Sequence, residues 1–254
     1  MLRWSTPFDG IPASVVMLLW AGLLPAEAGS FDHGAWSGIL ARHVKEGRVD
    51  YEALLRDRGS LDEYLERVAE ADLSGCAEAE RKAFWINVYN ARMVATVLDR
   101  WPLESVLDVG RVLGVPTLKA FREKHRLARS LRSLDDVEHG ILRKSYRDAR
   151  VHAALVCASA SCPALAPEAY LAEALDAQLD RAMDGFLRDP TRNRIFEDPP
   201  RLSKIFDWYA KDFKAEGGSV WGYVLGRLAP EERARVPGSA NPEYLDYDWS
   251  LNGR

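Results

Sequence analysis

The longest run of helical periodicity in this chain lies at residues 77–101, and it constrains the fold more than any other feature. Apolar side chains recur there at the spacing of one helix face. Pro102 ends the pattern, because a proline removes a backbone hydrogen bond and its ring clashes with the preceding turn. The sequence therefore predicts a long amphipathic helix that ends before Pro102.

Two asparagines lie on the apolar face of this predicted helix. Asn87 and Asn90 are three residues apart, so they share a face, and helical projection places them with Ala83, Val94 and Leu98. An unpaired amide on such a face costs free energy, so both side chains need hydrogen-bond partners. The partners are either backbone groups of a neighbouring loop or, in a functional interpretation, a catalytic group or a substrate amide.

The rest of the chain is predicted to be mostly helical, with a few short strands. A capping box at residues 133–136 opens a helix that runs to about Tyr146, and Ser203 caps a helix whose aromatic side chains have the spacing of core residues. Helical periodicity also marks residues 31–44, 54–68, 167–187 and 219–228, whereas strands are expected at 151–157, 194–196 and 245–251. The predicted fold class is α+β, a helix-rich single domain with a small sheet.

Composition limits the class of protein. Of the 254 residues, 47% are hydrophobic, which excludes an intrinsically disordered chain. The formal net charge of −4 lacks the basic excess of a nucleic-acid-binding protein, and three cysteines are too few for a disulfide-scaffolded small protein. No repeat or clear linker divides the chain, so residues 29–254 are predicted to form one domain.

The first 28 residues have the three-part plan of a secretory signal peptide. Arg3 precedes an apolar run at residues 11–24, and Ala26 and Ala28 provide the small residues that a signal peptidase reads. We expect cleavage after Ala28 and a periplasmic or secreted protein; the alternatives are an uncleaved membrane anchor or a buried N-terminal helix. No other stretch approaches the roughly 20 apolar residues of a bilayer span, so no stable membrane span is expected after cleavage.

A stripe of charged residues follows the capping box. Asp135, His139 and Arg143 are spaced by four residues, so they lie along one side of a helix. A carboxylate one turn before a histidine can fix its tautomer, and an arginine one turn after it opposes protonation, which suits a histidine whose charge state matters. The alternative is an ion-pair stripe near a helix start. The spacing does not match a metal-binding motif, so no metal is predicted.

A short apolar segment leads into a turn that contains two cysteines. Residues 151–157 run into small residues and end at Cys162, where exposed backbone N–H groups would activate a thiol and hold an oxyanion. Cys162 is then the candidate nucleophile, with His139 or His152 as the candidate base. In an exported protein Cys157 and Cys162 can equally form a local disulfide, and the sequence leaves both alternatives open.

Five motifs in a fixed order resemble a known family. They are GRVDY at residues 47–51, AFWINVYNA at 83–91, EHGILR at 138–143, SCP at 161–163 and KIFDWY at 204–209. Together they make residues 36–252 resemble the domain-of-unknown-function family 547, DUF547. The family includes exported bacterial proteins, and in plants the domain follows a coiled-coil region. It has no settled activity, so the resemblance implies only that these positions match family motifs: Asn87, Asn90, Glu138, His139, Arg143, His152, Cys157, Cys162 and Pro163.

These observations favour a thiol-dependent hydrolase or acyl/amide transferase of the cell envelope, acting on a small molecule or peptide. In this hypothesis Cys162 attacks a carbonyl and His139 takes its proton. Glu138 or Asp135 orients the histidine, while Asn87 or Asn90 positions a partner or stabilises charge, and Arg143 and His152 bind the substrate. Because the histidine precedes the cysteine, any papain- or transglutaminase-like core would have a permuted order.

The sequence is also compatible with two other functions. One is a non-catalytic periplasmic binding or interaction module in which a Cys157–Cys162 disulfide is structural. The other is a polar pocket that binds a small anion or sugar through Arg143 and the two asparagines. The chain has no glycine-rich phosphate loop and no G-x-S-x-G elbow, and no cofactor is predicted.

Overall fold

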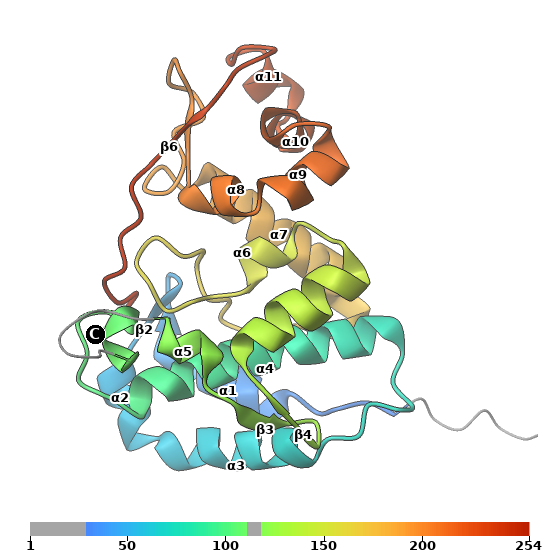
Figure 1. Ribbon diagram of the computed structural model, residues 1–254, viewed down its shortest axis with the longest axis vertical. Helices are drawn as coiled ribbons and strands as arrows, with labels where there is room; N and C mark the ends of the chain where they lie inside the picture. The colour runs from blue at the N-terminus through green and yellow to red at the C-terminus, as the bar shows by residue number, and fades with distance from the viewer. Residues whose placement is uncertain (1–28, 111–117, 254) are drawn as a thin grey trace, which may run out of the picture.

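The computed structural model describes residues 29–110 and 118–253, and these residues are mainly helical (Figure 1). The α-helices are α1 (Gly34–His43), α2 (Tyr51–Arg56), α3 (Arg58–Glu70), α4 (Glu78–Leu98), α5 (Lys119–Arg122), α6 (Val151–Ala154), α7 (Leu175–Arg188), α8 (Lys204–Trp208), α9 (Ala210–Gly217), α10 (Val220–Arg227) and α11 (Pro230–Arg233). Two 3-10 helices, η1 (Val106–Gly110) and η3 (Ala172–Ala174), and a π-helix, η2 (Asp136–Tyr146), join them.

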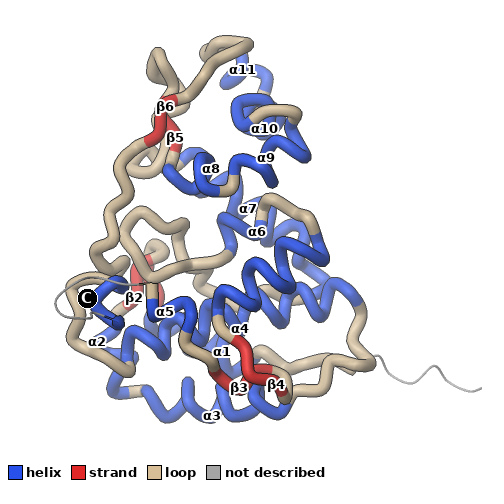
Figure 2. Tube along the Cα trace, viewed as in Figure 1, coloured by secondary structure: helices blue, strands red, loops and turns tan. Residues whose placement is uncertain are grey.

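The strands are short and form three two-stranded sheets among the described residues (Figure 2). The pairs are β1 (Val44–Lys45) with β2 (Arg48–Val49), β3 (His125–Leu127) with β4 (Ser130–Arg132), and β5 (Arg201–Leu202) with β6 (Glu243–Tyr244); the first two are antiparallel and the third is parallel. The helix-rich α+β prediction is confirmed. These small sheets give no support to a papain- or transglutaminase-like core.

Helix α4 is the central element, and its prediction from the sequence is confirmed. Nearly every side chain from Lys82 to Leu98 is buried, and α3, α5, η1, η2 and η3 pack around the helix. Acidic Glu78 and Glu80 lie in its first turn, where they interact favourably with the helix dipole. The helix thus lies between the lower helices of Figure 1 and the segments that contain the candidate site residues.

The buried apolar residues form two clusters. The larger cluster surrounds α4 and includes side chains of α1, α3, α5 and the segment after α6. The smaller cluster lies in the upper part of Figure 1, where α7, α8, α9 and α10 contribute their apolar faces. The C-terminal residues leave β6 and run down along one side of both parts to end near α2 (Figure 1).

Three predicted helix starts are confirmed by their capping hydrogen bonds. The Ser133 backbone N–H donates to Asp136 Oδ2 at 2.8 Å, and the Asp136 N–H donates to Ser133 Oγ at 3.1 Å, which is the reciprocal pattern of a capping box. Ser203 and Ser219 accept from the first backbone N–H groups of α8 and α10. The helix opened by Ser133 ends at Tyr146 as predicted, although most of it is a π-helix.

The predicted strand at 151–157 is wrong. Residues Val151–Ala154 form α6, and only Leu155 to Cys157 are extended. The extended backbone has no strand beside it, because the Asn90 side chain bonds it instead: Asn90 Nδ2 donates to the Ala154 carbonyl at 2.9 Å, and the Val156 N–H donates to Asn90 Oδ1 at 2.9 Å. A side-chain amide therefore replaces a sheet partner.

Three other predicted elements differ in part. At residues 194–196 the structure has a single bridge, Arg194 with Arg201, instead of a strand. The predicted helix at 167–187 begins later, at Leu175, because the extended backbone at Tyr170 is bonded by the Asn87 side chain. The tail at 245–251 alternates between covered and exposed side chains as predicted, but apart from bridges at Ser250 and Leu251 it is a loop.

Two predictions about the chain's organisation are not tested by this structure. The predicted signal segment, residues 1–28, lies outside the described residues. The single domain at 29–254 stays a prediction. Within the described ranges, no helix combines the length and apolar character needed to cross a bilayer.

The buried His33 predicts how stability depends on pH. Burial lowers the pKa of His33 to about 4 from 6.5, and its Nδ1 pairs with the Tyr64 hydroxyl at 2.8 Å. Between these two values the unfolded chain binds a proton that the folded chain does not, so the free energy of unfolding falls as pH drops from 6.5 to 4. We expect a loss of about 2–3 kcal/mol from this residue.

Chemical denaturation at a series of pH values tests this expectation. His33→Phe places a ring that does not titrate among Phe31, Tyr64 and Phe84. The variant should show a flatter dependence of unfolding free energy on pH above 4. An unchanged slope in the variant would contradict the assignment to His33.

Candidate functional site

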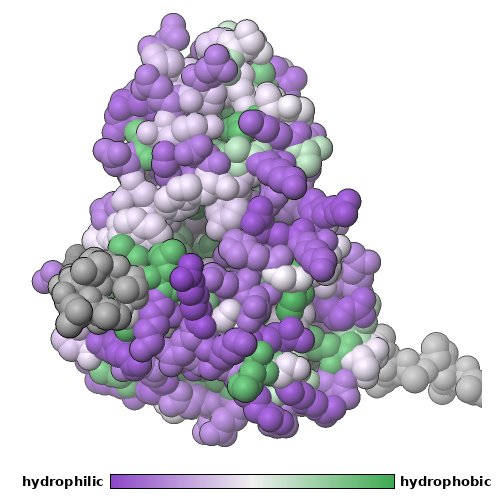
Figure 3. Space-filling model, in the orientation of Figure 1, coloured by the Kyte–Doolittle hydropathy of each residue, from purple (hydrophilic) through white to green (hydrophobic). Residues whose placement is uncertain are grey.

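A pocket of about 380 Å³ lies between the two apolar clusters. Figure 3 shows the molecule hollowed at this place, between α8 and α5. The pocket draws residues from seven regions: α4, α5, η2, α6, the segment after α6, the α8–α9 region and the C-terminal tail. Its lining residues are Tyr89, Leu118, Phe121, Asp135, Glu138, His139, Arg143, His152, Leu155, Cys157, Cys162, Ile205, Trp208, Tyr209, Tyr247 and Trp249.

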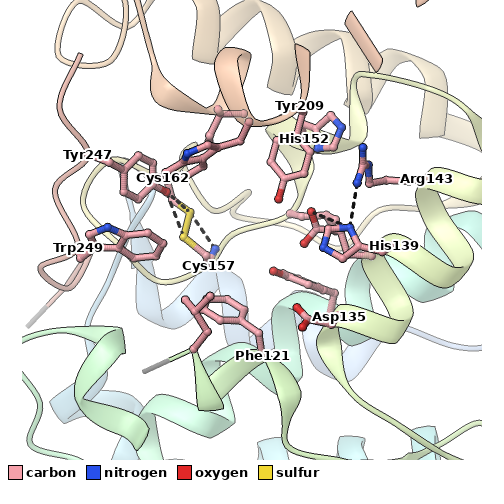
Figure 4. A pocket seen from close by; sticks show the side chains of 16 residues that line it. Phe121, Asp135, His139, Arg143, His152, Cys157, Cys162, Tyr209, Tyr247 and Trp249 are labelled. Carbon is pink, nitrogen blue, oxygen red and sulfur yellow. Dashed lines mark hydrogen bonds and ion pairs between the residues drawn. A yellow bond between two sulfur atoms is a disulfide. The ribbon is translucent and has the colours of Figure 1, made fainter. Parts of the chain in front are cut away.

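The two cysteines of the turn form a disulfide on one wall of this pocket (Figure 4). The Cα atoms of Cys157 and Cys162 are 6.2 Å apart, within the usual range for a disulfide. The disulfide alternative of the sequence analysis is thus the one that the structure adopts. Cys162 is only 2% exposed, whereas Cys157 is half-buried, so Cys157 is the more accessible sulfur.

Hydrogen-bond donors surround both sulfur atoms. The Tyr247 hydroxyl lies 3.2 Å from Cys157 Sγ and 3.4 Å from Cys162 Sγ, and Ser159 Oγ lies 3.0 Å from Cys157 Sγ. The Cys157 N–H donates to Cys162 Sγ at 2.9 Å. Ser159 Oγ also donates to the Tyr247 hydroxyl at 2.9 Å, so the Tyr247 hydrogen is the hydroxyl hydrogen directed at the sulfurs. A donor at this position stabilises a thiolate more than a disulfide, because a hydrogen bond is stronger when its acceptor is charged.

The C-terminal tail and one arginine hold the cysteine turn. The Ala160 N–H donates to the Ser250 carbonyl at 2.7 Å, and the Asn252 N–H donates to the Ala158 carbonyl at 3.0 Å. From the other side, the Arg192 guanidinium donates to the carbonyls of Cys162 and Ala160. The turn is therefore fixed by segments that lie far from it in sequence.

A chain of four polar side chains forms the opposite wall. Arg143 donates to His139 Nδ1 at 3.1 Å and binds Asp212 with two hydrogen bonds of 2.6 and 3.0 Å. The same carboxylate accepts from His152 Nε2 at 2.8 Å. His152 is buried and stacks on Tyr209 with ring centroids 3.9 Å apart, whereas the His139 side chain is 48% exposed.

This arrangement decides which nitrogen of His139 carries a proton. A guanidinium can only donate, so Nδ1 accepts and the neutral ring carries its hydrogen on Nε2. Glu138 Oε1 is 3.9 Å from His139 Nδ1, too far for a hydrogen bond, and Glu138 instead helps to raise the pKa values of Tyr89 and Tyr209. Glu138 therefore does not orient His139 as the sequence hypothesis expected.

Burial and charge shift several pKa values around the pocket. The hydrogen bond from His152, reinforced by Arg143, holds the pKa of Asp212 well below its usual range. Burial raises the pKa of Asp135, and it raises the pKa of Tyr247 to about 12. Burial and then Glu138 raise the pKa of Tyr209 far above its usual value. The tyrosines are therefore neutral donors at neutral pH, and Asp212 is a fixed negative charge.

Aromatic side chains form most of the remaining wall. Trp208, Tyr247 and Trp249 pack against one another with ring centroids 4.7 to 5.8 Å apart, and Phe121 lies across from Tyr247 and Trp249 (Figure 4). The sequence analysis treated the aromatic residues near 206–213 as core, which holds for Phe206 and Phe213 but misses Trp208 and Tyr209. Asp212 was also missed. The alternation of apolar and polar residues at 245–251 was the sequence signal that one face of the tail, with Tyr247 and Trp249, is covered.

The structure brings seven predicted residues to this pocket and leaves two out. The residues that line it are Asp135, Glu138, His139, Arg143, His152, Cys157 and Cys162. Asn87 and Asn90 do not; they are almost fully buried, and each amide pairs with backbone groups. The backbone interpretation of the two asparagines is therefore confirmed, and a direct catalytic contact for them finds no support.

The described part of the chain contains no group of three or more His, Cys, Asp and Glu side chains placed to hold a metal ion. The side chains at the cysteine wall and opposite it that can take part in chemistry are the two sulfurs, the imidazole of His139 and the hydroxyls of Ser159 and Tyr247.

One of three comparisons with known proteins gave a match. Residues 73–187 match the model of a family described as "Protein of unknown function, DUF547". The resemblance to this family is therefore confirmed over the matched residues. The matched segment includes α4, η2 and both cysteines, but Trp208, Tyr209, Asp212, Tyr247 and Trp249 lie beyond it. Searches of curated proteins and of solved structures found no match.

The two histidines of the site are expected to differ in their effect on stability. His139→Ala removes an exposed ring and should change the free energy of unfolding by less than about 0.5 kcal/mol. His152→Ala leaves a cavity and removes a partner of Asp212, so it should cost about 2–4 kcal/mol. Thermal or chemical denaturation of both variants measures the difference. A large destabilisation by His139→Ala would instead indicate a structural role for that ring.

Proposed function

We propose that this DUF547 protein is a thiol-dependent hydrolase or acyl/amide transferase whose substrate-facing nucleophile is Cys157, masked as a disulfide in the oxidised state. One observation carries the proposal: the Cys157 sulfur and the imidazole of His139 line the same pocket from opposite walls (Figure 4). A carbonyl compound held in the pocket would lie between the nucleophile and a hydrogen-bond donor.

The role of nucleophile passes from Cys162 to Cys157 for a physical reason. The Cys162 side chain is almost completely buried and its sulfur is bonded from behind by the Cys157 N–H. Cys157 is half-buried and has two hydroxyls near its sulfur. Cys162 then acts as the partner that protects Cys157 by oxidation.

The reaction begins with reduction of the disulfide by an external thiol. Two equivalents of that thiol are oxidised to a disulfide, and Cys157 and Cys162 each gain a hydrogen. The Cys157 thiolate, stabilised by the Tyr247 hydroxyl, attacks the substrate carbonyl carbon and forms a carbon–sulfur bond. The tetrahedral intermediate collapses as the bond to the leaving group breaks, and the leaving group takes a proton from solvent.

His139 has a different role here from the one expected from the sequence. Its Nδ1 accepts from Arg143, so the neutral ring offers an N–H to the pocket rather than a free lone pair. That N–H would stabilise the oxyanion of the intermediate. Water or an acceptor amine or alcohol then attacks the thioester, releases the acyl group and returns the thiol.

Thiol labelling tests the choice of nucleophile without knowledge of the substrate. In a Cys76→Ser background, Cys162→Ser frees Cys157, and Cys157→Ser frees Cys162 as the matched control. Cys157 should react with iodoacetamide at neutral pH at least about tenfold faster than Cys162, because it is the more accessible thiol. The protein with both cysteines should react only after reduction.

Two results would contradict the proposal. Equal or faster labelling of Cys162 would remove Cys157 as the nucleophile. Absence of labelling at both residues, in variants that melt like the parent, would favour the alternative function, a non-catalytic binding module with a structural disulfide. The specific observation in favour of that alternative is the close hold of the C-terminal tail and Arg192 on the cysteine turn.

We also propose that the protein is exported to the periplasm or beyond the cell, as its N-terminal sequence suggests. The disulfide supports this location, because disulfides persist mainly in oxidising compartments. Expression of the full chain followed by cell fractionation and intact-mass measurement should give a product lacking residues 1–28 outside the cytoplasm. A full-length product in the cytoplasmic fraction would refute the location.

A further inference from the structure

A second groove adjoins the pocket beside η2 and α9. It has a volume of about 490 Å³ and shares His139 and Arg143 with the first pocket, so the two are adjacent hollows joined at these residues. The groove is lined by His139, Arg143, Lys144, Arg147, Asp148, Lys211, Asp212 and Ala215. Its lining is charged, whereas the first pocket is largely aromatic.

The carboxylates of this groove are already neutralised by other cations. Asp212 is bound by Arg143 and His152, and Asp148 pairs with Lys82 and Arg150. These pairs lie at the groove's floor, where the side chains of Asp148 and Asp212 are 12% and 26% exposed. They therefore offer little negative charge to a ligand that enters the groove.

Three cations remain without a counter-ion at the groove's rim. Lys144, Arg147 and Lys211 are exposed, and among the ion pairs between residues 29–110 and 118–253 none involves them. The groove thus has a local excess of positive charge in a chain whose formal net charge is −4. Three like charges around one hollow repel one another, and an anion placed among them relieves that repulsion.

We propose that this groove binds the anionic end of the molecule whose apolar or aromatic part fills the first pocket. This anionic end is a phosphate or a carboxylate, and a linker that passes His139 and Arg143 joins it to the apolar part. The inference deepens the proposed function by naming the substrate class: an aromatic or alkyl acyl compound with a terminal negative charge. Binding of the anion in the groove fixes the orientation of the ligand. The reacting carbonyl then lies near His139, where the groove and the first pocket meet.

Binding measurements on the oxidised full-length protein test this without any thiol chemistry. The probes are 4-phenylbutyl phosphate, 4-phenylbutyrate and the neutral 4-phenylbutanol, titrated by calorimetry and by the fluorescence of Trp208 and Trp249, which line the first pocket. We expect the two anions to bind at least about fivefold more tightly than the alcohol. Raising the salt from about 20 mM to about 200 mM should weaken binding of the anions only.

A pair of variants locates the anion. Lys144→Gln with Lys211→Gln should bring the affinity for both anions close to that for the alcohol. Lys214→Gln is the matched control, because Lys214 is exposed on the same helix as Lys211 but does not line the groove. The control should bind all three probes as the parent does.

The outcomes separate this inference from the proposed function. Three results would overturn the inference: equal affinities for the three probes, absence of binding, or an effect of Lys214→Gln equal to that of the double variant. Fast labelling of Cys157 would still support its role as the nucleophile. Tight anion binding in a protein whose Cys157 does not label would keep the anionic ligand and overturn the enzyme. A difference between phosphate and carboxylate affinities identifies which anion the groove prefers.

Discussion

This structure depends on one constraint: buried backbone N–H and C=O groups need hydrogen-bond partners. Two extended segments cross the face of α4 without any strand beside them, and unpaired backbone groups there would be costly. Asn87 and Asn90 supply the missing partners through both atoms of each amide. Because Asn90 fixes the backbone at Ala154 and Val156, it also fixes where Cys157 enters the pocket. The two amides thus support the site from behind instead of taking part in its chemistry.

The pocket exists because two apolar clusters meet along a seam that the cysteine turn and the tail only partly fill. The lower cluster contributes Phe121 and Leu155, and the upper one contributes Ile205 and Tyr209. The part of the chain that matches the family model holds the sulfurs and His139, whereas the aromatic wall comes from residues after it. Substitutions in that aromatic wall can therefore change which ligand enters the pocket, while the two sulfurs and the His139 imidazole stay the same.

Electrostatics assign a role to each polar group of the site. Asp212 holds a negative charge that both His152 and Arg143 need, and Arg143 in turn fixes the proton position on His139. Nδ1 is therefore the acceptor, and Nε2 is the ring nitrogen left to face the pocket. The same arginine marks the boundary between the aromatic pocket and the cationic groove, so a single side chain links the proposed oxyanion donor to the proposed anion site.

The sequence by itself determined the helix at 77–101, the caps at Ser133 and Ser203 and the helix that starts after Ser219, because these depend on local periodicity and capping. It also named His139, Arg143, His152 and the two cysteines as candidate residues, and all of them line the pocket. It misread 151–157 as a strand, since an apolar run does not reveal that a distant asparagine will bond its backbone. Only the tertiary structure decided that Cys157 is more exposed than Cys162 and that Asp212 and Tyr247 join the site. Those properties depend on contacts between residues 60 or more positions apart, which no local pattern encodes.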